Sequence, residues 1–391
     1  YIRLINSGGK MQSDLFDQQH NRYDTNLDFN SKYFVSHLIT YIGNKRKLLP
    51  FIDNTVEKVK HNLHKDKIIA LDGFSGSGVV ARLLKYHTTT LYSNDFEQYA
   101  KTINTAYLTN KSDVDTKRLS EAIKYLNEHR LDKTKSDYFI TTNYAPKNDD
   151  DIKAGERVFY THNNAQAIDN IRYMIDHDID EDLRIYCLAQ LLVQASIHTN
   201  TSGVFKGFHK KDGIGHFGGA GENALERIKG DIILEEPLFA EAENDTTVFC
   251  KDTNELVKEL EPVDLAYFDP PYNQHPYGSN YFMLNIINGG KPVAIQSGVS
   301  GISEEWQRSD YNKAEPAIKV MDDLIANTKA RYILISYNDE GIIPINKFEN
   351  IVKKYGSWEL LEQEYNTYRG SRNLRNRNNK VRELLWLIKK D

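Results

Sequence analysis

Cysteine is scarce in this sequence: only Cys187 and Cys250 occur among 391 residues. The two lie far apart and outside any Cys-x-x-Cys spacing, which excludes both a disulfide framework and a zinc site built from cysteine. Such cysteine usage is typical of a cytoplasmic protein. We therefore expect a cytoplasmic protein without a bound metal.

Long hydrophobic runs are also missing. Apolar stretches such as residues 188–197 and 332–336 are far shorter than the ~20 residues that a bilayer requires. No positively charged and then apolar signal opens the chain. We expect no membrane association.

An excess of positive charge is absent as well. Lysine and arginine number 50 against 55 aspartate and glutamate residues, a formal net charge of -5. This balance excludes a protein whose whole surface is a polycation. Any polyanionic partner must therefore contact a local basic patch.

The length suits one large α/β domain with an insertion, or two domains. Residues 1–30 show neither helical nor strand periodicity, and we expect a tail or an added linker there. Helical spacing of apolar residues predicts a helix over 44–63. A strand over 68–71, a helix over 79–87 and a strand over 89–93 follow. This order predicts a βαβ unit and a parallel sheet.

The middle of the chain is mostly helical, and strands return after it. The expected helices cover residues 120–129, 164–175 and 181–197, and the expected strands cover 247–250, 264–268, 331–337, 359–368 and 381–388. The last two strands predict a terminal hairpin with a long basic loop. We therefore expect a sheet domain formed by 31–104 and 246–391, interrupted by a helical lobe at 105–245.

A glycine-rich turn, residues 72–78 (Asp-Gly-Phe-Ser-Gly-Ser-Gly), follows the first expected strand. Glycines there let backbone N–H groups approach a ligand closely, and the N-terminus of the next helix favours an anionic group. Residues 76–81 also fit the dinucleotide pattern G-x-G-x-x-A. Asp95 ends the next strand, where a carboxylate can accept hydrogen bonds from ribose hydroxyls. A plain turn, an NAD site and an S-adenosylmethionine site all remain open from this motif.

A second motif, Asp269-Pro270-Pro271-Tyr272, follows another apolar strand. Two prolines cannot continue a central ladder, so the strand ends there and projects Asp269 and Tyr272 from its carboxyl end. Asp269 and the Pro270 carbonyl could each accept one hydrogen of an exocyclic amine, and Tyr272 could stack on the base, which must leave its helix to reach the pocket. A Pro-Pro turn with a capping aspartate is the alternative interpretation.

Together and in this order, the motifs resemble the Dam-type adenine-specific DNA methyltransferases, the α arrangement of the amino-methyltransferases. The family's opening motif matches residues 41–45 (Tyr-Ile-Gly-Asn-Lys), its F-x-G-x-G motif matches 74–78, and its D-P-P-Y motif matches 269–272. Dam itself carries Trp-Ala-Gly-Gly-Lys in the opening motif. The variant here resembles restriction-associated members more closely. The resemblance covers roughly residues 38–104 and 246–391.

The resemblance implies an α/β fold, a Rossmann-like class I methyltransferase sheet. That sheet is mixed and seven-stranded with a terminal β-hairpin, and a mainly helical target-recognition domain is inserted at 105–245. It also implies S-adenosylmethionine as cofactor and the adenine amino group of duplex DNA as acceptor. The implied catalytic residues are Asp269, Pro270, Pro271 and Tyr272. The implied cofactor-binding residues are Tyr41, Gly43, Lys45, Asp72, Phe74, Ser75, Gly76, Gly78, Asp95, Asp252 (to the cofactor adenine) and Asp269.

Two basic stretches could contact DNA. The terminal hairpin loop contains an acid-free run with Arg369, Arg372, Arg375 and Arg377, and phosphate contact is the functional interpretation. A Gly-rich, aromatic stretch over 205–219 holds Lys206, His209, Lys210 and Lys211. It cannot be a regular element, and such irregular loops are usually functional. A solvated hairpin tip and a flexible linker are the respective alternatives.

Duplex DNA is thus the expected partner, together with a cognate restriction endonuclease sharing the same target. Two other functions remain open. An RNA amino-methyltransferase would use the same chemistry, and DNA is preferred only through the resemblance. A catalytically inactive DNA-recognition subunit is the other alternative. The intact Asp269, Tyr272 and Asp95 argue against it.

Overall fold

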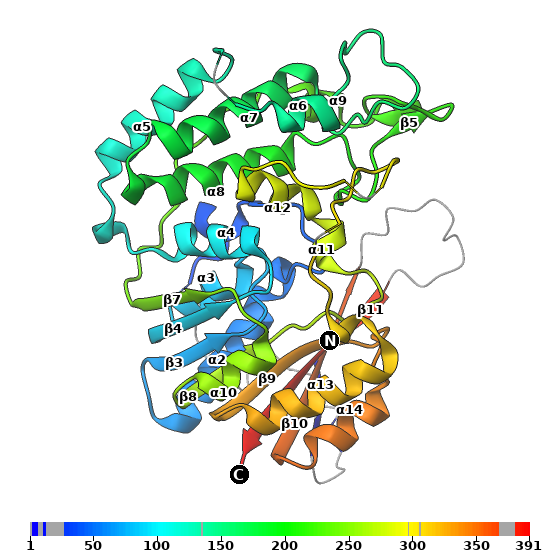
Figure 1. Ribbon diagram of the computed structural model, residues 1–391. Helices are drawn as coiled ribbons and strands as arrows, with labels where there is room; N and C mark the ends of the chain where they lie inside the picture. The colour runs from blue at the N-terminus through cyan, green and yellow to red at the C-terminus, as the bar shows by residue number, and fades with distance from the viewer. Residues whose placement is uncertain are drawn as a thin grey trace.

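A sheet domain carries a helical lobe in this protein, as Figure 1 shows. The computed structural model describes residues 2–6, 11–12, 27–133, 136–295, 297–304, 306–366 and 380–391. Within these ranges, no helix is both long and apolar enough to cross a membrane.

Seven strands form the main part of the sheet. In spatial order they are β7 (Asp245–Phe249), β4 (Thr88–Asn94), β3 (Ile68–Asp72), β8 (Val263–Phe268), β9 (Ala330–Asn338), β11 (Lys380–Lys390) and β10 (Gly356–Asn366). The strands from β7 to β9 pair in parallel, whereas β11 is antiparallel to both β9 and β10. The predicted mixed seven-stranded sheet with a terminal hairpin is confirmed.

Two short strands from the N-terminal segment extend this sheet. Strand β1 (Ile2–Asn6) pairs antiparallel with β10, and β2 (Met11–Gln12) pairs with β1. The expectation that residues 1–30 are a tail outside the fold is therefore wrong for these two strands. A strand of five residues gives little periodicity. The exposed backbone edge of β10 supplies its partner.

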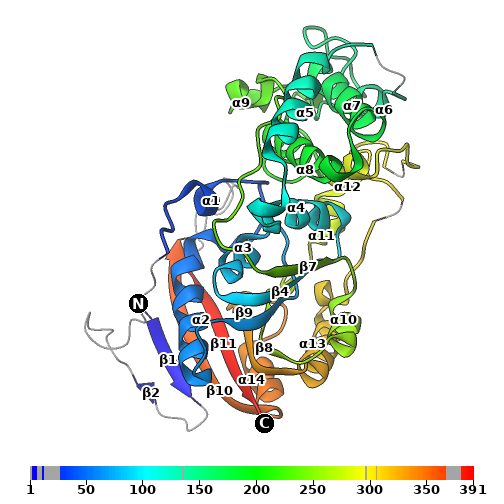
Figure 2. The same cartoon turned by 90° about the vertical axis from the view of Figure 1, so that its left-hand side faces the viewer.

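Helices cover both faces of the sheet (Figure 2). One face carries α2 (Leu49–Leu63) and α3 (Val79–Lys85). The other carries α10 (Thr253–Glu259), α13 (Ala314–Asn327) and α14 (Ile345–Val352). Side chains alternate along the strands, so Leu265 and Tyr267 of β8 pack toward the first face and Ala266 and Phe268 toward the second. All six residues of β8 are buried, as a central parallel strand requires.

Helix α2 begins later than predicted. Asn44 does not cap it. A 3₁₀ turn, η1 (Arg46–Leu48), comes first and the α-helix starts at Leu49. Pro50 lies in the first helical turn, where its missing N–H costs no hydrogen bond. The proline therefore fixes the start of the helix.

The lobe contains helices, a small hairpin and short 3₁₀ turns. Its elements are η2 (Lys111–Asp113), α5 (Thr116–His129), α6 (Phe139–Tyr144), α7 (His162–His177), α8 (Glu181–Ile197), β5 (Lys210–Lys211), β6 (Ile214–Gly215), η3 (Gly219–Gly221) and α9 (Leu225–Lys229). The remaining elements are α1 (Lys32–Val35), α4 (Gln98–Leu108), α11 (Tyr277–Asn280), α12 (Phe282–Gly289) and η4 (Asp310–Asn312).

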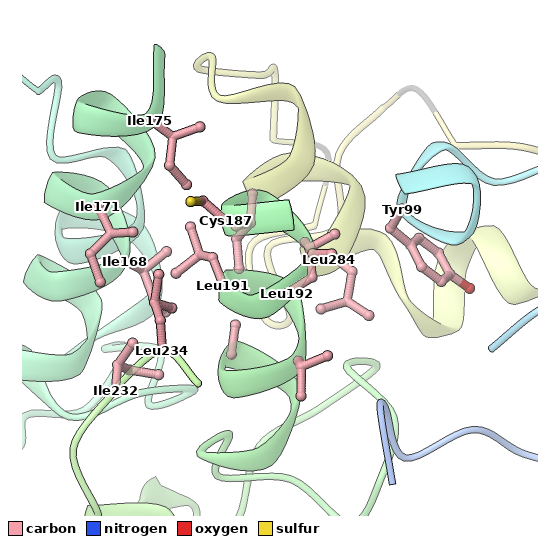
Figure 3. Packing of buried hydrophobic residues seen from close by; sticks show 14 of the residues in the cluster. Tyr99, Ile168, Ile171, Ile175, Cys187, Leu191, Leu192, Ile232, Leu234 and Leu284 are labelled. Atoms are coloured by element: carbon pink, nitrogen blue, oxygen red, sulfur yellow. The ribbon is translucent and has the colours of Figure 1, made fainter. Parts of the chain in front are cut away.

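The apolar core of the lobe continues into α4 and α12. Figure 3 shows Leu191 of α8 close to Ile171 of α7, with Leu284 of α12 and Tyr99 of α4 on the other side of α8. All four of these side chains are buried. A helix that follows the Asp-Pro-Pro-Tyr motif in sequence is thus packed into the core of the lobe.

The two chain crossings between the sheet domain and the lobe are joined by a buried lysine. Lys85 Nζ donates to Asn110 Oδ1 at 2.7 Å and to Asn244 Oδ1 at 2.8 Å. Asn110 lies on the outgoing crossing and Asn244 on the returning one. This contact fixes the base of the lobe on α3.

Candidate active site

A pocket opens at the edge of the sheet where β3, β4, β7 and β8 end. Its wall includes ten of the eleven residues predicted to bind the cofactor: Tyr41, Gly43, Lys45, Asp72, Phe74, Ser75, Gly76, Asp95, Asp252 and Asp269. Of the four predicted catalytic residues, Asp269 and Pro271 line the pocket. Gly78, Pro270 and Tyr272 do not. The motifs are therefore brought together in space.

The glycine-rich turn needs glycine for two different reasons. Gly76 and Gly78 have φ values of 51° and 77°, which L side chains rarely adopt. A Cβ on Gly76 would lie 2.7 Å from Tyr41 Cε1, and one on Gly78 would lie 2.5 Å from Asn104 Oδ1. Gly76 thus lets the turn approach the opening motif, and Gly78 lets α3 pack against α4.

Asp72 is an unpaired carboxylate at the end of β3. The residue is 1% exposed, and among the described residues no cation or side-chain donor meets either oxygen; only the backbone N–H groups of Phe74 and Ala81 act on it. Burial, together with the nearby Asp269, raises the pKa of Asp72 well above its usual value. A buried carboxylate without a partner is costly unless a cation or donor meets it. The sulfonium and ammonium groups of S-adenosylmethionine would fit this requirement.

Asp95 fixes the backbone around the pocket. Its Oδ2 accepts a hydrogen bond from Gly76 N at 2.7 Å, and its Oδ1 accepts one from Glu97 N at 2.9 Å. Burial raises the pKa of Asp95 to about 6. Asp252 lies across the pocket and caps α10, accepting hydrogen bonds from the backbone N–H of Asn254 and Glu255. Their predicted contacts to ribose and adenine stay predictions.

Lys45 joins the opening motif to the Asp-Pro-Pro-Tyr motif. Its Nζ lies 3.2 Å from Asp269 Oδ1 and 2.8 Å from Glu383 Oε1 of β11. Burial opposes the charge on Lys45, but the two carboxylates outweigh it and raise the pKa of the lysine. Burial raises the pKa of Asp269 to about 7, although Lys45 pulls it down and Glu383 adds to the rise. The pKa of Asp269 therefore lies close to neutral pH, where the carboxyl group changes between its protonated and ionised forms.

Tyrosines fix the opening motif in place. The ring of Tyr41 stacks on Tyr277 and on Tyr281, with centroids 5.0 and 4.9 Å apart. Tyr281 Oη accepts a hydrogen bond from Ile42 N, and Tyr277 Oη donates one to the Ile42 carbonyl. The opening motif, which forms part of the pocket wall, is thus held in place by the segment that follows Tyr272.

Comparison with known proteins identifies this arrangement. The model of the D12 class N6 adenine-specific DNA methyltransferases matches residues 41–351, roughly four fifths of the chain.

The chain belongs to this family.

Named relatives agree with this family assignment. The Type II methyltransferase M.NlaIII of Neisseria lactamica is 28% identical over 362 residues, which cover 90% of this chain and 99% of that protein. Modification methylase StsI of Streptococcus sanguinis is 30% identical over 90% of this chain. Modification methylase LlaI of Lactococcus lactis subsp. lactis is 29% identical over the same share. The chain spans about half the length of these last two, 52% and 55%. The predicted resemblance to restriction-associated adenine methyltransferases is confirmed.

Several pocket residues of this D12-class methyltransferase were not predicted from the sequence. Glu97 and Gly278 line the wall, as do Gln307 and Tyr311 from the segment before α13. Glu383 contacts Lys45 from a strand near the opposite end of the sequence. Glu97 offered a signal, since it lies two residues after Asp95. No motif pointed to Glu383, which is 0% exposed in the apolar strand β11.

Tyr272 lies beside the ion pair rather than in the pocket wall. Its ring meets Tyr337 edge-on at 6.1 Å, and Lys45 Nζ lies 5.4 Å from its centroid. A Cβ on Gly43 would lie 2.7 Å from Tyr272 Oη. Gly43 therefore allows the two motifs to approach each other.

The basic stretch over 205–219 contains a regular element, contrary to expectation. Strands β5 and β6 pair around a turn at Asp212 and Gly213, both with positive φ. The turn explains the discrepancy, because Asp-Gly forms the two-residue hairpin connection at little steric cost. The three predicted lysines, Lys206, Lys210 and Lys211, are exposed and His209 is half-buried.

This hairpin is attached close to the pocket. Phe205 N donates to the Asn280 carbonyl of α11 at 2.7 Å, three residues from Tyr277. The other predicted DNA contacts, Arg369, Arg372, Arg375 and Arg377, lie outside the described residues. Strand β10 runs parallel to β9, so it ends at Asn366 on the pocket edge of the sheet. Across the described ranges, no group of three or more His, Cys, Asp or Glu residues could hold a metal ion.

Proposed function

We propose that S-adenosylmethionine binds in the pocket and that the methyl group is transferred to an adenine extruded from duplex DNA. The observation that carries this proposal is the shared wall: the Lys45–Asp269 pair and the unpaired Asp72 line one pocket. One carboxylate is thus available to a cation and the other to an amine.

The residues of this wall suit the cofactor. When bound, S-adenosylmethionine supplies a methyl group activated by the positive charge of its sulfonium. Asp72 would hold a cationic part of the molecule. The turn around Gly76 would let the backbone come close to it, and Asp252 would accept a hydrogen bond from its adenine.

Asp269 and Pro270 would prepare the acceptor nitrogen. An exocyclic amine is a poor nucleophile because its lone pair is delocalised into the ring. Asp269 would accept one amino hydrogen and the Pro270 carbonyl the other, so that the lone pair points toward the methyl group. Lys45 favours the ionised form of Asp269. The proton can leave after transfer, so Asp269 need not be a strong base, and Tyr272 would stack on the extruded base.

The lobe and the basic loops would hold the duplex. Lys206, Lys210 and Lys211 would contact phosphates from the hairpin, together with the arginines of the β10–β11 loop. Because β10 ends on the pocket edge, that loop begins on the side from which a base would enter. The protein would act in the cytoplasm on bacterial DNA.

Methyl transfer in a matched pair of variants tests this function. Asp269→Asn should lose at least a hundredfold in incorporation of labelled methyl from S-adenosylmethionine into duplex DNA, because the neutral amide is a weaker acceptor of the amino hydrogen than the charged carboxylate. Asp322→Asn, a partly exposed residue paired with Lys354 far from the pocket, is the control. Equal incorporation by wild type and Asp269→Asn contradicts the catalytic role. Absence of transfer by wild type would favour a recognition subunit, and transfer to RNA alone would favour the RNA enzyme.

A cognate endonuclease would share the target sequence of this methyltransferase. The support is the set of relatives named as modification methylases. DNA modified by this protein should then resist cleavage by an endonuclease in extracts of the source cells, whereas unmodified DNA is cut. Equal cleavage of both would exclude such a partner.

A further inference from the structure

Glu97 is a buried carboxylate of the pocket for which the proposed chemistry provides no role. Its side chain is 3% exposed and lines the pocket wall. Oε2 accepts a hydrogen bond from Asn285 Nδ2 at 2.6 Å. Oε1 lies beside Gly278, another wall residue, where an added Cβ would be 3.0 Å away. The described residues place no cation against this carboxylate.

A purely structural role explains Glu97 poorly. A hydrogen bond between α4 and α12 could be made by two neutral amides, without burying a charge. An uncompensated buried carboxylate is costly, and its neighbour Asp95 adds repulsion. Burial raises the pKa of Glu97 to about 7, which reflects this cost. Donors supplied by a ligand would offset it.

Asp95 alone is poorly arranged to hold a vicinal diol. Both of its oxygens already accept backbone hydrogen bonds, from Gly76 and from Glu97 itself. The backbone N–H of Phe96 also acts on this carboxylate, so only about one of its roughly four acceptor positions remains for a ligand. A ribose offers two hydroxyl donors side by side, and a second carboxylate two residues along the chain would supply the additional acceptor.

Asn285 holds Glu97 from a helix that belongs to the core of the lobe. The amide donates to Glu97, and its Oδ1 accepts a hydrogen bond from Tyr99 N. Leu284, the preceding residue, packs with α8 (Figure 3). Asn288 lies one helical turn after Asn285, and its Oδ1 accepts a hydrogen bond from Thr102 Oγ1 of α4. This contact also joins α4 and α12, but neither residue lines the pocket.

We propose that Glu97 is a further cofactor-binding residue that accepts a hydrogen bond from the ribose diol, and that Asn285 is the residue that positions it. This inference rests on the proposed binding of S-adenosylmethionine in the pocket. Helix α12, which packs into the core of the lobe, would then position one residue of the cofactor site.

Binding of S-adenosylhomocysteine, measured by calorimetry without turnover, tests Glu97. Glu97→Gln keeps an oxygen for Asn285 but replaces the second acceptor by an amide N–H. We expect about tenfold weaker binding or more, as for loss of a hydrogen bond to a charged group. Wild type should also discriminate against the 2′-deoxy or 3′-deoxy ribose analogue, and Glu97→Gln should lose that discrimination.

A double-mutant cycle tests the positioning role. Asn285→Asp keeps the acceptor for Tyr99 but removes the donor to Glu97, so binding should weaken severalfold. In the Glu97→Gln background the same change should cost little, because the glutamine amide can donate to the new carboxylate. The matched control is Asn288→Ala, which should bind S-adenosylhomocysteine as wild type does. Thermal unfolding of each variant verifies that it is folded.

The outcomes separate the two proposals. If wild type fails to bind S-adenosylhomocysteine, the proposed cofactor site is wrong. If wild type binds and Glu97→Gln binds equally well, or retains full discrimination against the deoxy analogues, the inference is overturned. Equal costs of Asn285→Asp in the two backgrounds would overturn the positioning role.

Discussion

At the scale of single residues, Glu383 influences the charge of Asp269, the carboxylate proposed to accept the amino hydrogen. Lys45 lies between two acids, and the negative charge of Glu383 adds to the burial that raises the pKa of Asp269. In its proposed role, Asp269 accepts an amino hydrogen more strongly when it is ionised. The activity of the free enzyme should therefore fall as pH decreases through about 7, the pKa of Asp269.

Replacing Glu383 should move this pH dependence. Glu383→Gln removes the negative charge that raises the pKa of Asp269, so the carboxylate ionises at lower pH. We expect the acidic limb of the kcat/KM profile to shift to lower pH. The profile is measured with duplex DNA as substrate, and Asp322→Asn again serves as control. A limb that stays in place, or moves to higher pH, would show that another group controls it.

Motifs predicted part of the pocket wall, because their residues lie at strand ends or in the short opening motif. Lys45, Asp72 and Asp269 each belong to a short pattern whose chemistry can be interpreted locally. Glu383 belongs to none, since its contact with Lys45 exists only after β11 inserts between β9 and β10. Pairing across the sheet is a property of the fold, and no spacing in the sequence encodes it.

At the scale of elements, the β5–β6 hairpin is a compact, exposed carrier of positive charge. Lys210 Nζ lies 5.0 Å from the centroid of Phe208, and the hairpin is fixed to the lobe through Asn200, which accepts from Gly218 N and donates to the Val158 carbonyl. The stretch is therefore an ordered projection rather than a flexible linker. A fixed hairpin can present both lysines to one DNA backbone.

Removing the two hairpin lysines should weaken DNA binding in a salt-dependent way. Lys210→Ala with Lys211→Ala should lower the slope of log affinity against log salt by roughly 2, because each phosphate contact contributes about 0.9. Lys117→Ala with Lys124→Ala in α5, at the other end of the lobe in Figure 1, is the control. A filter-binding or anisotropy titration measures both. An unchanged slope would exclude phosphate contacts by the hairpin.

Long helices were predicted well, and short elements defined by packing were not. Helix α8 begins and ends at the predicted residues 181 and 197. Helix α12 was missed because it is only eight residues long, too short for its apolar spacing to identify a helix. It is buried between α4 and α8, a position that only the assembled lobe determines.

At the scale of the whole molecule, stability should depend on the protonation of His87. Its Nε2 lies 2.6 Å from Asp53 Oδ1 and its Nδ1 lies 3.1 Å from Glu57 Oε1, both on α2. Burial opposes a charge on His87, but the two carboxylates outweigh it and raise the pKa. The imidazolium therefore links α2 to the start of β4.

The sign of the pH dependence follows from that raised pKa. The contribution of His87 is fully present below about pH 6.5, the pKa in an unfolded chain, and is lost as pH rises through the folded-state pKa. His87→Gln should lower the free energy of unfolding by roughly 2 kcal/mol at pH 6, and by less at pH 9. Urea denaturation over this range measures it, with the exposed His275→Gln as control. A difference that grows with pH would contradict the assignment.

The ion pair between Lys45 and Glu383 also has a consequence for the synthesis of the protein on the ribosome. These residues are 338 positions apart, so at about 5–20 residues per second translation needs roughly 17 to 70 s between them. Only in the last part of that interval, the 111 positions from Tyr272 to Glu383, does the nascent chain hold both motifs while it still lacks β11. We expect methylation to begin only after the final strand emerges, so that an unfinished copy cannot modify DNA.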